Sequence, residues 1–340
     1  MAPASPAPLA LTMGEPSGIG PDITAFAWLA LTQRRGPQFF VIGDLNYLRS
    51  RIGHLELDIP VAAIVSPDET PAMFERAIPV LHRSFEHTPA IGSPSPETAL
   101  RVIAFIDEAV TLAMDGSASA LVTNPIQKET LYRAGFNHEG HTDYLAYLAR
   151  EAGAEAEPVM MLCANALRTI PVTVHIPLAQ VSSVLSIDLI VSQARIAARD
   201  LEARFGIAEP RLGVTGLNPH AGEAGAMGDE EQRIISPAIA ALKAEGLHVE
   251  GPLPADTAFH EEARSRYDVI LCMYHDQALI PVKTLDFHGG VNCTLGLPFV
   301  RTSPDHGTGL AIAGSGKAKP TSLIAAIELA AGLAGRRSLR

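Results

Sequence analysis

The sequence predicts an α/β protein with a mainly parallel sheet. Three observations support this fold class: short apolar runs alternate with helical patterns over most of the chain, no flexible linker or internal repeat interrupts them, and 47% of the 340 residues are hydrophobic although only 5% are aromatic. Strands that alternate with helices indicate βαβ units and hence parallel pairing. The length fits about two domains, each with a largely aliphatic core.

The individual elements follow from the apolar pattern. Short apolar runs bounded by turn residues predict buried strands over Leu9–Thr12, Phe39–Ile42, Ala120–Thr123, Thr169–His175, Arg211–Leu217 and Val269–Met273. The clearest helix is expected over Ser95–Met114, with Ser95 as N-cap and Pro96 at the first helical position. Its buried stripe comprises Ile103, Ile106, Val110 and Ala113. Further helices are expected over Ser186–Arg204, Asp229–Glu245 and Thr321–Leu333.

Composition limits the classes of partner. Lys and Arg number 26 against 37 Asp and Glu, a net charge of −11, whereas a general nucleic-acid binder needs a basic surface. No apolar run reaches the about 18 residues of a membrane helix, and Met1–Ala10 lacks the regions of a signal peptide. We therefore expect a cytoplasmic protein without a membrane or nucleic-acid partner, in which Cys163, Cys272 and Cys293 are free.

A Gly-rich segment, Met13–Asp22, follows the first predicted strand and precedes a helix. It reads MGEPSGIGPD and matches neither the dinucleotide fingerprint GxGxxG nor a phosphate loop with its lysine. Three interpretations stay open: a phosphate cradle, a tight structural turn, and a segment that contacts a substrate.

Three histidines, His175, His220 and His275, follow predicted strands. Parallel sheets place their chemistry at the carboxyl ends of strands, and three neutral imidazoles suit zinc or cobalt while leaving positions for a substrate. The spacing contains no local metal motif. Each histidine can instead cap a helix or bond a carbonyl group, and this alternative stays open.

Residue types that bind anions gather in two segments. The first is an apolar, Gly/Pro-rich stretch with Lys283, Asn292 and Arg301 at intervals of nine residues. Arginine binds phosphate or carboxylate through two parallel hydrogen bonds, and lysine adds a charge; a solvated surface is the alternative. In the second segment His141 and Thr142 can donate to a phosphate, whereas the nearby Asp143 can N-cap the following helix.

Six segments together resemble one family, the 4-hydroxythreonine-4-phosphate dehydrogenases of pyridoxal phosphate biosynthesis. They extend from Met13 to Thr308, nearly the whole chain. The segments are MGEPSGIGPDI, VTNPIQK with RAGFNHEGHTDYLA, GLNPHAGEAG, GPLPADTAFH, CMYHDQALIPVKTLDF and GVNCTLGLPFVRTSPDHGT. LNPHAGE and YHDQALIPVKT are long, ordered and specific.

The resemblance implies a fold like that of isocitrate and isopropylmalate dehydrogenases, not a Rossmann fold. Two α/β/α domains with a cleft between them are expected, one from residues 1–138 and 305–340, the other from residues 139–304 with the metal histidines and dimer contacts. The resemblance also implies a homodimer whose active site uses residues of both subunits. The absence of GxGxxG agrees with this fold.

The resemblance assigns roles to the candidate residues. The ligands of one divalent metal per subunit (Zn, Co or Mg) are matched by His175, His220 and His275. The substrate-binding positions are matched by His141, Thr142, Lys283, Asn292 and Arg301. Asp256 is a further candidate near the substrate, and Asp276 and Lys283 are candidate catalytic residues. Asp276 can orient the neighbouring ligand or carry a proton, but the sequence identifies no general base.

The implied reaction oxidises a small phosphorylated hydroxy amino acid. NAD or NADP takes a hydride from 4-phosphohydroxy-L-threonine, whose hydroxyl is acidified by the metal. The product, 2-amino-3-oxo-4-phosphohydroxybutyrate, then decarboxylates to 3-amino-2-oxopropyl phosphate. The Gly309–Lys317 stretch is expected on the cofactor side. It departs from the family pattern at Gly309, usually Ala, and at Ala311, usually acidic, which leaves the choice between NAD and NADP open.

Competing functions share parts of this pattern. Paralogous dehydrogenases act on phosphorylated four-carbon sugar acids or on aromatic cis-dihydrodiol carboxylates. Dihydrodiols lack phosphate, so the retained residues His141, Thr142, Lys283 and Arg301 favour a phosphorylated substrate. A metal-dependent phosphohydrolase and a non-catalytic binding protein are more distant alternatives.

Overall fold

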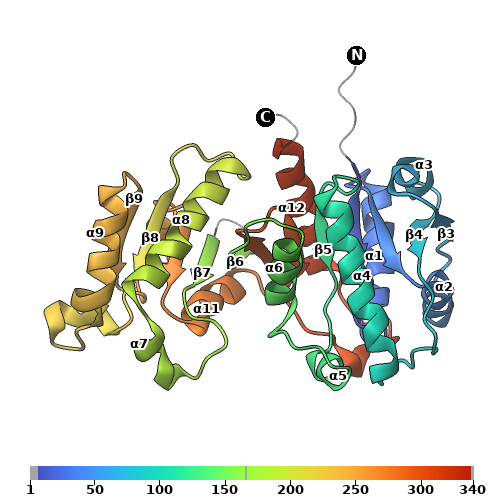
Figure 1. Ribbon diagram of the computed structural model, residues 1–340, viewed down its shortest axis with the longest axis horizontal. Coiled ribbons are helices and arrows are strands. Elements are labelled where there is room, and N and C mark those ends of the chain that lie inside the picture. Colours follow the sequence, from blue (N-terminus) through green and yellow to red (C-terminus); the bar gives the residue numbers. More distant parts are fainter. Residues whose placement is uncertain (1–6, 165–166, 338–340) are drawn as a thin grey trace, which may run out of the picture. The chain divides into compact units, whose positions relative to one another are not determined.

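The computed structural model describes residues 7–164 and 167–337 and confirms the α/β fold (Figure 1). The chain divides into two compact units: unit 1 combines the part up to Pro158 with the part from Leu297 onward, and unit 2 is Val159–Gly296. These divisions differ from the expected boundaries after residues 138 and 304, because α6 (His141–Glu151) packs on α4 (Pro96–Met114) in unit 1. Residues 1–6 of the expected N-terminal lead-in lie outside the described residues.

The strands of unit 1 are all parallel to their neighbours, in the order β3-β4-β2-β1-β5-β12. Most of their residues are buried and apolar, which is typical of parallel strands covered on both faces. Their bounds are β1 Leu9–Thr12, β2 Phe39–Gly43, β3 Val61–Ile64, β4 Ile78–His82, β5 Leu121–Thr123 and β12 Arg301–Pro304. The pairing of β5 with β12 joins both ends of the chain into one unit.

Helices pack on this sheet in two groups. In the first group, α1 contacts both α2 and α12. In the second group, α4 contacts α5 and α6 (Figure 1). The remaining bounds are α1 Gly20–Gln33, α2 Leu45–His54, α3 Thr70–Phe74, α5 Lys128–Arg133 and α12 Thr321–Arg337. α4 begins after Ser95 as predicted, although the Ser95 side chain makes no capping bond and Ile103 is only half-buried. Val102 takes the fully buried position instead.

Unit 2 has the strand order β11-β6-β7-β10-β8-β9. β6 is antiparallel to both of its neighbours, β11 and β7, and the other pairs are parallel. The bounds are β6 Val159–Ala164, β7 Leu167–Pro171, β8 Arg211–Thr215, β9 His248–Leu253, β10 Val269–Cys272 and β11 Val291–Leu295. The strand predicted over Thr169–His175 was wrong at its end, because the chain bends after Pro171.

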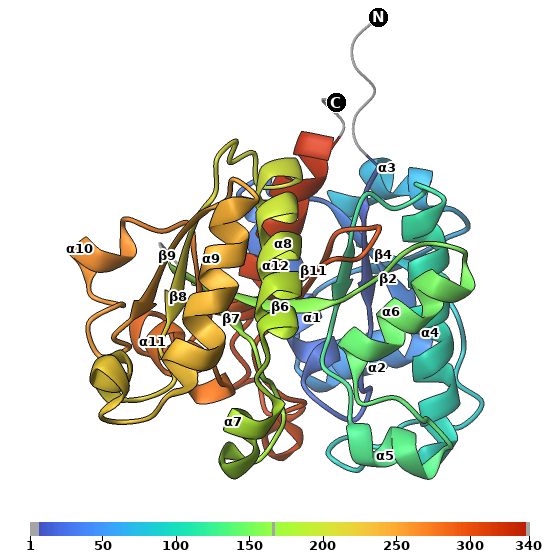
Figure 2. The ribbon, with the colours of Figure 1, turned by 60° about the vertical axis from the view of Figure 1, so that its left-hand side comes forward.

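The helices of unit 2 lie on both faces of its sheet. α8 (Ile187–Ala203) packs on α9 (Ser236–Ala244), and α11 (His275–Leu285) packs on β6, β7 and β10 (Figure 2). The short helices are α7 Val181–Val184 and α10 Glu261–Arg264. Between the strands and α11 lies an apolar cluster that includes Leu162, Ile270, Cys272 and Val282. This cluster fixes α11, and therefore its first residues, against the strand ends.

Two further expectations concern the whole chain. In residues 7–164 and 167–337 no single helix is long and apolar enough to cross a membrane. Only Leu178–Val184 and α8 taken together, across a 91° bend, meet that measure. Cys163, Cys272 and Cys293 are free thiols, as predicted.

Candidate functional site

The three histidines follow neighbouring strands of unit 2. β10 lies between β7 and β8 and is parallel to both. His175 follows β7, His220 follows β8, and His275 is the first residue of α11 after β10. Carboxyl ends of parallel strands share one edge of a sheet. The topology therefore directs all three segments to the same edge.

His175 and His275 are neighbours in space, with ring centroids 5.7 Å apart. The backbone fixes this approach, because Thr173 donates to the Met273 carbonyl oxygen from its backbone nitrogen (3.3 Å) and from Oγ1 (2.8 Å). Oδ1 of Asp276 lies 2.7 Å from Nδ1 of His275. A carboxylate in this position orients an imidazole so that Nε2 faces a metal ion. The donor types of this pair fit a divalent metal.

His220 is not part of this pair. It begins a short turn after β8, and its side chain is exposed. Within the two described ranges of the chain, no three His, Cys, Asp or Glu side chains come close enough to hold a metal ion. The structure of one chain thus brings together two of the three predicted ligands.

Gln277 connects the ends of the strands, and no sequence pattern singled it out. Its side chain is buried, and its Oε1 accepts from Thr215 Oγ1 (2.8 Å) and from the Met273 backbone nitrogen (2.6 Å). Its Nε2 donates to the carbonyl oxygen of Gly216 at 2.9 Å. One amide therefore fixes the end of β8 to the end of β10. The only available signal was its position two residues after His275.

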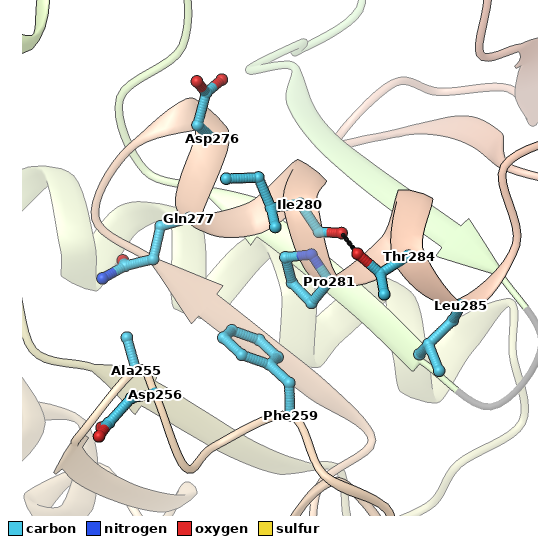
Figure 3. A pocket seen from close by; sticks show the side chains of 9 residues that line it. All are labelled: Ala255, Asp256, Phe259, Asp276, Gln277, Ile280, Pro281, Thr284 and Leu285. Atoms are coloured by element: carbon cyan, nitrogen blue, oxygen red, sulfur yellow. Dashed lines mark hydrogen bonds between the residues drawn. The ribbon is translucent and has the colours of Figure 1, made fainter.

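A mainly apolar pocket of about 370 Å³ lies along α11. It is lined by Ala255, Asp256, Phe259, Asp276, Gln277, Ile280, Pro281, Thr284 and Leu285. Figure 3 shows Asp276 at one end of this group of side chains and Asp256 at the other, with Gln277 between them and Ile280 and Pro281 to one side. The two predicted acidic residues therefore border the same pocket, and Asp276 directly follows His275 in the chain.

Lys283 and Asn292 differ in their surroundings. Lys283 lies in the last turn of α11 with its Nζ 5.5 Å from the ring centroid of Phe287. Asn292 belongs to β11, and its Oδ1 is buried without a hydrogen-bond partner among the described residues. An unpaired buried acceptor is costly, so Asn292 is suited to receive a donor from a ligand. Arg301, the third residue of this row, belongs to unit 1.

Arg301 and His141 form a polar site in unit 1. Arg301 is 3% exposed, and its Nη2 donates to Thr123 Oγ1 at 2.7 Å. His141 and Thr142 begin α6, and Nε2 of His141 is buried with no hydrogen-bond partner in the described part of the chain. Burial, and then the positive charges of Arg301 and Lys128, hold the pKa of His141 well below its usual value. The ring is therefore neutral at pH 7.

Lys128 belongs to this site, although no role was predicted for it. It is the first residue of α5, and a Cβ at Gly140 would lie 2.9 Å from its Cε. Its side chain thus passes over the start of α6. Asp143 is not the N-cap of α6, because Gly140 takes that position. Asp143 lies in the first turn and accepts from the Glu139 backbone nitrogen at 3.4 Å.

The Met13–Asp22 segment is a buried turn. Arg51 enters it and donates to the Pro16 carbonyl oxygen (2.7 Å) and to Asp22 Oδ1 (2.8 Å). Glu15 is buried beside them, and burial raises the pKa of its carboxyl group. A turn that contains two buried acidic residues is a poor phosphate cradle, which favours the structural interpretation.

The Gly309–Lys317 stretch is anchored to this turn. Oδ2 of Asp22 accepts from the backbone nitrogen of Gly314 at 2.7 Å. Gly314 has a φ of 71°, where a side chain is strained. Ala311 is exposed. The expected cofactor stretch is therefore a surface loop attached to a buried ion pair.

Comparison with known proteins identifies the family. The model of the pyridoxal phosphate biosynthetic protein PdxA family matches residues 36–330. A 4-hydroxythreonine-4-phosphate dehydrogenase of Bradyrhizobium diazoefficiens is 51% identical over 338 residues, 97% of this chain and 98% of that protein. A solved 4-hydroxythreonine-4-phosphate dehydrogenase from Klebsiella pneumoniae has a TM-score of 0.86 and 37% identity, and the match covers 96% of this chain and 99% of that one. A terephthalate 1,2-cis-dihydrodiol dehydrogenase from Burkholderia xenovorans is more distant, with a TM-score of 0.63 and 26% identity over 96% of this chain and 98% of that one. The chain therefore belongs to the PdxA family of pyridoxal phosphate biosynthetic proteins.

Proposed function

We propose that this protein oxidises 4-phosphohydroxy-L-threonine with NAD or NADP and a divalent metal in pyridoxal 5'-phosphate biosynthesis. The product is 2-amino-3-oxo-4-phosphohydroxybutyrate, which decarboxylates to 3-amino-2-oxopropyl phosphate. Relatives named for this activity match almost the whole chain. Within the structure, one observation carries the proposal: the buried, unpaired Nε2 of His141 beside the positive charges of Arg301 and Lys128.

This group of side chains suits a phosphate. Arg301 and Lys128 provide positive charge, and arginine can bind phosphate oxygens through two parallel hydrogen bonds. The neutral ring of His141 donates from Nε2 in one of its two tautomers. α6 begins here, so the amides around Thr142 add the partial positive charge of a helix N-terminus. In the proposal Lys283 and Asn292 bind the amino acid end of the substrate.

His175, His220 and His275 would hold the divalent metal, for which zinc, cobalt and magnesium are candidates. When bound, the metal acidifies the substrate hydroxyl and the nicotinamide cofactor accepts the hydride. Asp276 orients His275 through the contact at Nδ1. Asp276 and Lys283 are proposed to move the proton that leaves the hydroxyl.

A homodimer would complete the metal site. Because only His175 and His275 adjoin in one chain, we infer that His220 acts together with the pair of a second copy. This organisation is the one implied by likeness to isocitrate and isopropylmalate dehydrogenases, in which two α/β/α domains serve one site. The three free thiols support the cytoplasm as its location, since disulfides are rare there.

The test is reduction of NAD or NADP by the purified protein. The substrates are 4-phosphohydroxy-L-threonine, a phosphorylated tetronic acid and a cis-dihydrodiol carboxylate, each with and without a strong chelator. Fast, chelator-sensitive reduction with the first substrate is expected, and comparison of the two nucleotides identifies the cofactor. Faster reduction with either other substrate by the metal-loaded protein contradicts the proposal.

A substitution in the phosphate site links this activity to the structure. Arg301→Ala should raise the KM for the phosphorylated substrate by about 10- to 100-fold, the range for a lost hydrogen bond to a charged group. The control is Lys243→Ala, in the last turn of α9. It should leave the KM for the phosphorylated substrate unchanged. An unchanged KM for Arg301→Ala would exclude this side chain from phosphate binding.

A further inference from the structure

The turn that carries His220 has a backbone that L-residues rarely adopt. The five successive residues from His220 to Ala224 have φ values between 41° and 76°, and only Gly222 among them lacks a Cβ. Left-handed backbone costs energy at each residue with a Cβ, and it normally occurs at one residue at a time. A run of this length persists only where the surroundings determine it.

The side chain of Glu231 holds the turn in this conformation. Glu231 is 3% exposed, and its Oε1 accepts from the backbone nitrogens of Leu217 and Asn218, both at 2.8 Å. Its Oε2 accepts from Nδ2 of Asn218 at 3.0 Å. One buried carboxylate therefore holds the two residues that lead from β8 into the turn.

The same carboxylate packs against the turn itself. A Cβ at Gly222 would lie 2.5 Å from Oε2 of Glu231, and a Cβ at Gly216 would lie 3.0 Å from Oε1. Glycine at these two positions lets the carboxylate fit between the end of β8 and the turn. The conformation of the turn and the position of the carboxylate thus depend on each other.

We propose that Glu231 is a positioning residue for His220. Its buried carboxylate holds the left-handed turn in the conformation that presents the His220 imidazole to the metal. The inference rests on the proposed function, in which His220 is a metal ligand. An amide cannot replace the carboxylate, because three N–H donors converge on its two oxygens and an amide has only one oxygen.

Glu231→Gln tests this role. The new amide nitrogen would face Nδ2 of Asn218 as a second donor, and the turn would loosen. We expect the affinity for Co²⁺, measured by competition with a chromophoric chelator, to fall by about tenfold, as when a metal ligand loses the partner that orients it. The visible absorption spectrum of the Co²⁺ form should also change. A purely structural role would lower the unfolding temperature and leave that spectrum unchanged, which would overturn the proposal.

Glu230→Gln is the matched control. It removes the same charge one residue earlier, where Oε2 of Glu230 accepts from Nδ2 of Asn218 at 2.7 Å. The amide oxygen of glutamine can still accept that bond. This variant should keep the wild-type Co²⁺ affinity and spectrum. Equal losses in both variants would mean that negative charge, not the shape of the turn, is responsible.

Ala224→Gly tests the conformational step. Ala224 is exposed and has a φ of 56°, so glycine relieves backbone strain without loss of packing. Added to Glu231→Gln, it should restore Co²⁺ affinity by about fivefold; no recovery would overturn the proposal. If Glu231→Gln does not fold, Ala224→Gly alone should bind Co²⁺ at least as tightly as the wild type, and weaker binding would contradict the proposal.

Different results contradict the metal site and the role of Glu231. A wild-type protein that binds no Co²⁺ contradicts the metal site and with it the proposed function. A wild-type protein that binds Co²⁺, with an unaffected Glu231→Gln variant, contradicts only the role of Glu231.

Discussion

Buried polar atoms without a hydrogen-bond partner in residues 7–164 and 167–337 are the most informative atoms of this protein. Nε2 of His141 and Oδ1 of Asn292 are of this kind. The imidazole nitrogen donates or accepts according to its tautomer, whereas the amide oxygen only accepts. Each atom is therefore available to a polar ligand group: the ring nitrogen to an acceptor or a donor, and the amide oxygen to a donor.

Lys128 is expected to strengthen the binding of the phosphate. Lys128→Ala removes one of the two positive charges beside His141, and KM for the phosphorylated substrate should rise about tenfold, equivalent to about 1.4 kcal/mol. Initial-rate kinetics at low ionic strength measure the effect, because salt screens an exposed charge. Arg76→Ala serves as the control for loss of an exposed cation in the same unit. A KM that is unaffected by Lys128→Ala would contradict this role.

The thiols are expected to be unreactive in the folded protein. Burial raises the pKa of Cys163 to about 12 and also raises the pKa of Cys272. Because the thiolate is the reactive form, only about one Cys163 thiol in 10⁴ is reactive at pH 8. A disulfide-exchange reagent at pH 8 should therefore react slowly with the native protein and rapidly with the protein unfolded in guanidinium. Rapid reaction of one thiol per native chain with the reagent would disprove this expectation.

At the scale of elements, a buried ion pair joins α1, α2 and the Gly309–Lys317 loop. Both side chains, Arg51 and Asp22, are 0% exposed. Asp22→Ala leaves the guanidinium buried without a carboxylate, and the free energy of unfolding should fall by about 3–5 kcal/mol. Urea unfolding measures this change. The double variant with Arg51→Met should lose less than the single variant, and a greater loss in the double variant would refute the explanation.

The same loop offers a test of cofactor preference. Ala311→Asp adds a carboxylate at an exposed position of the loop, and a carboxylate repels the extra phosphate of NADP. The ratio of kcat/KM for NAD over NADP should rise about tenfold, or about 1.4 kcal/mol. Ala311→Asn, of nearly equal size, is the neutral control. An identical ratio in both variants would show that this loop does not contact the ribose of the cofactor.

The elements were predicted best where the local sequence carries a plain signal. β1 lies where its apolar run predicts it, and α4 begins at Pro96, as predicted from Ser95 and Pro96. β11 and β12 were missed, because polar side chains leave no continuous apolar run: Asn292 and Thr294 in VNCTL, and the first three residues of RTSP. Two candidate site residues, Asn292 and Arg301, thus lie in strands that the apolar pattern does not reveal.

At the scale of the whole molecule, the assembly of the site could not be predicted from the sequence. β10 separates β7 from β8 in the sheet, although it follows both in the chain. This order makes His275 the neighbour of His175. The contributions of Lys128, Gln277 and Glu231 depend on contacts of this kind. Gln277 lies within YHDQALIPVKT and Lys128 ends VTNPIQK, but neither segment assigns these side chains a role.

An experiment with mixed dimers can test whether the metal histidines of one site come from two subunits. His220→Ala and His275→Ala should each abolish activity. After unfolding and refolding of an equal mixture, half of the dimers are mixed and one of their two sites is intact, so about a quarter of the wild-type activity should return. Each variant refolded alone is the control. No recovery from the mixture would place all three histidines within one subunit.

The discontinuity of unit 1 has a consequence for synthesis. Arg301 bonds to Thr123 across 178 residues, whereas unit 2 is one continuous segment. Chains leave the ribosome N-terminus first, so β5 has an unpaired edge until β12 emerges, and unit 2 can be completed in the meantime. A nascent chain therefore completes last the site that we propose for the phosphate. Chains released before Arg301 would contain the histidines but could not hold the substrate, and their exposed strand edge would mark them for chaperones or proteases.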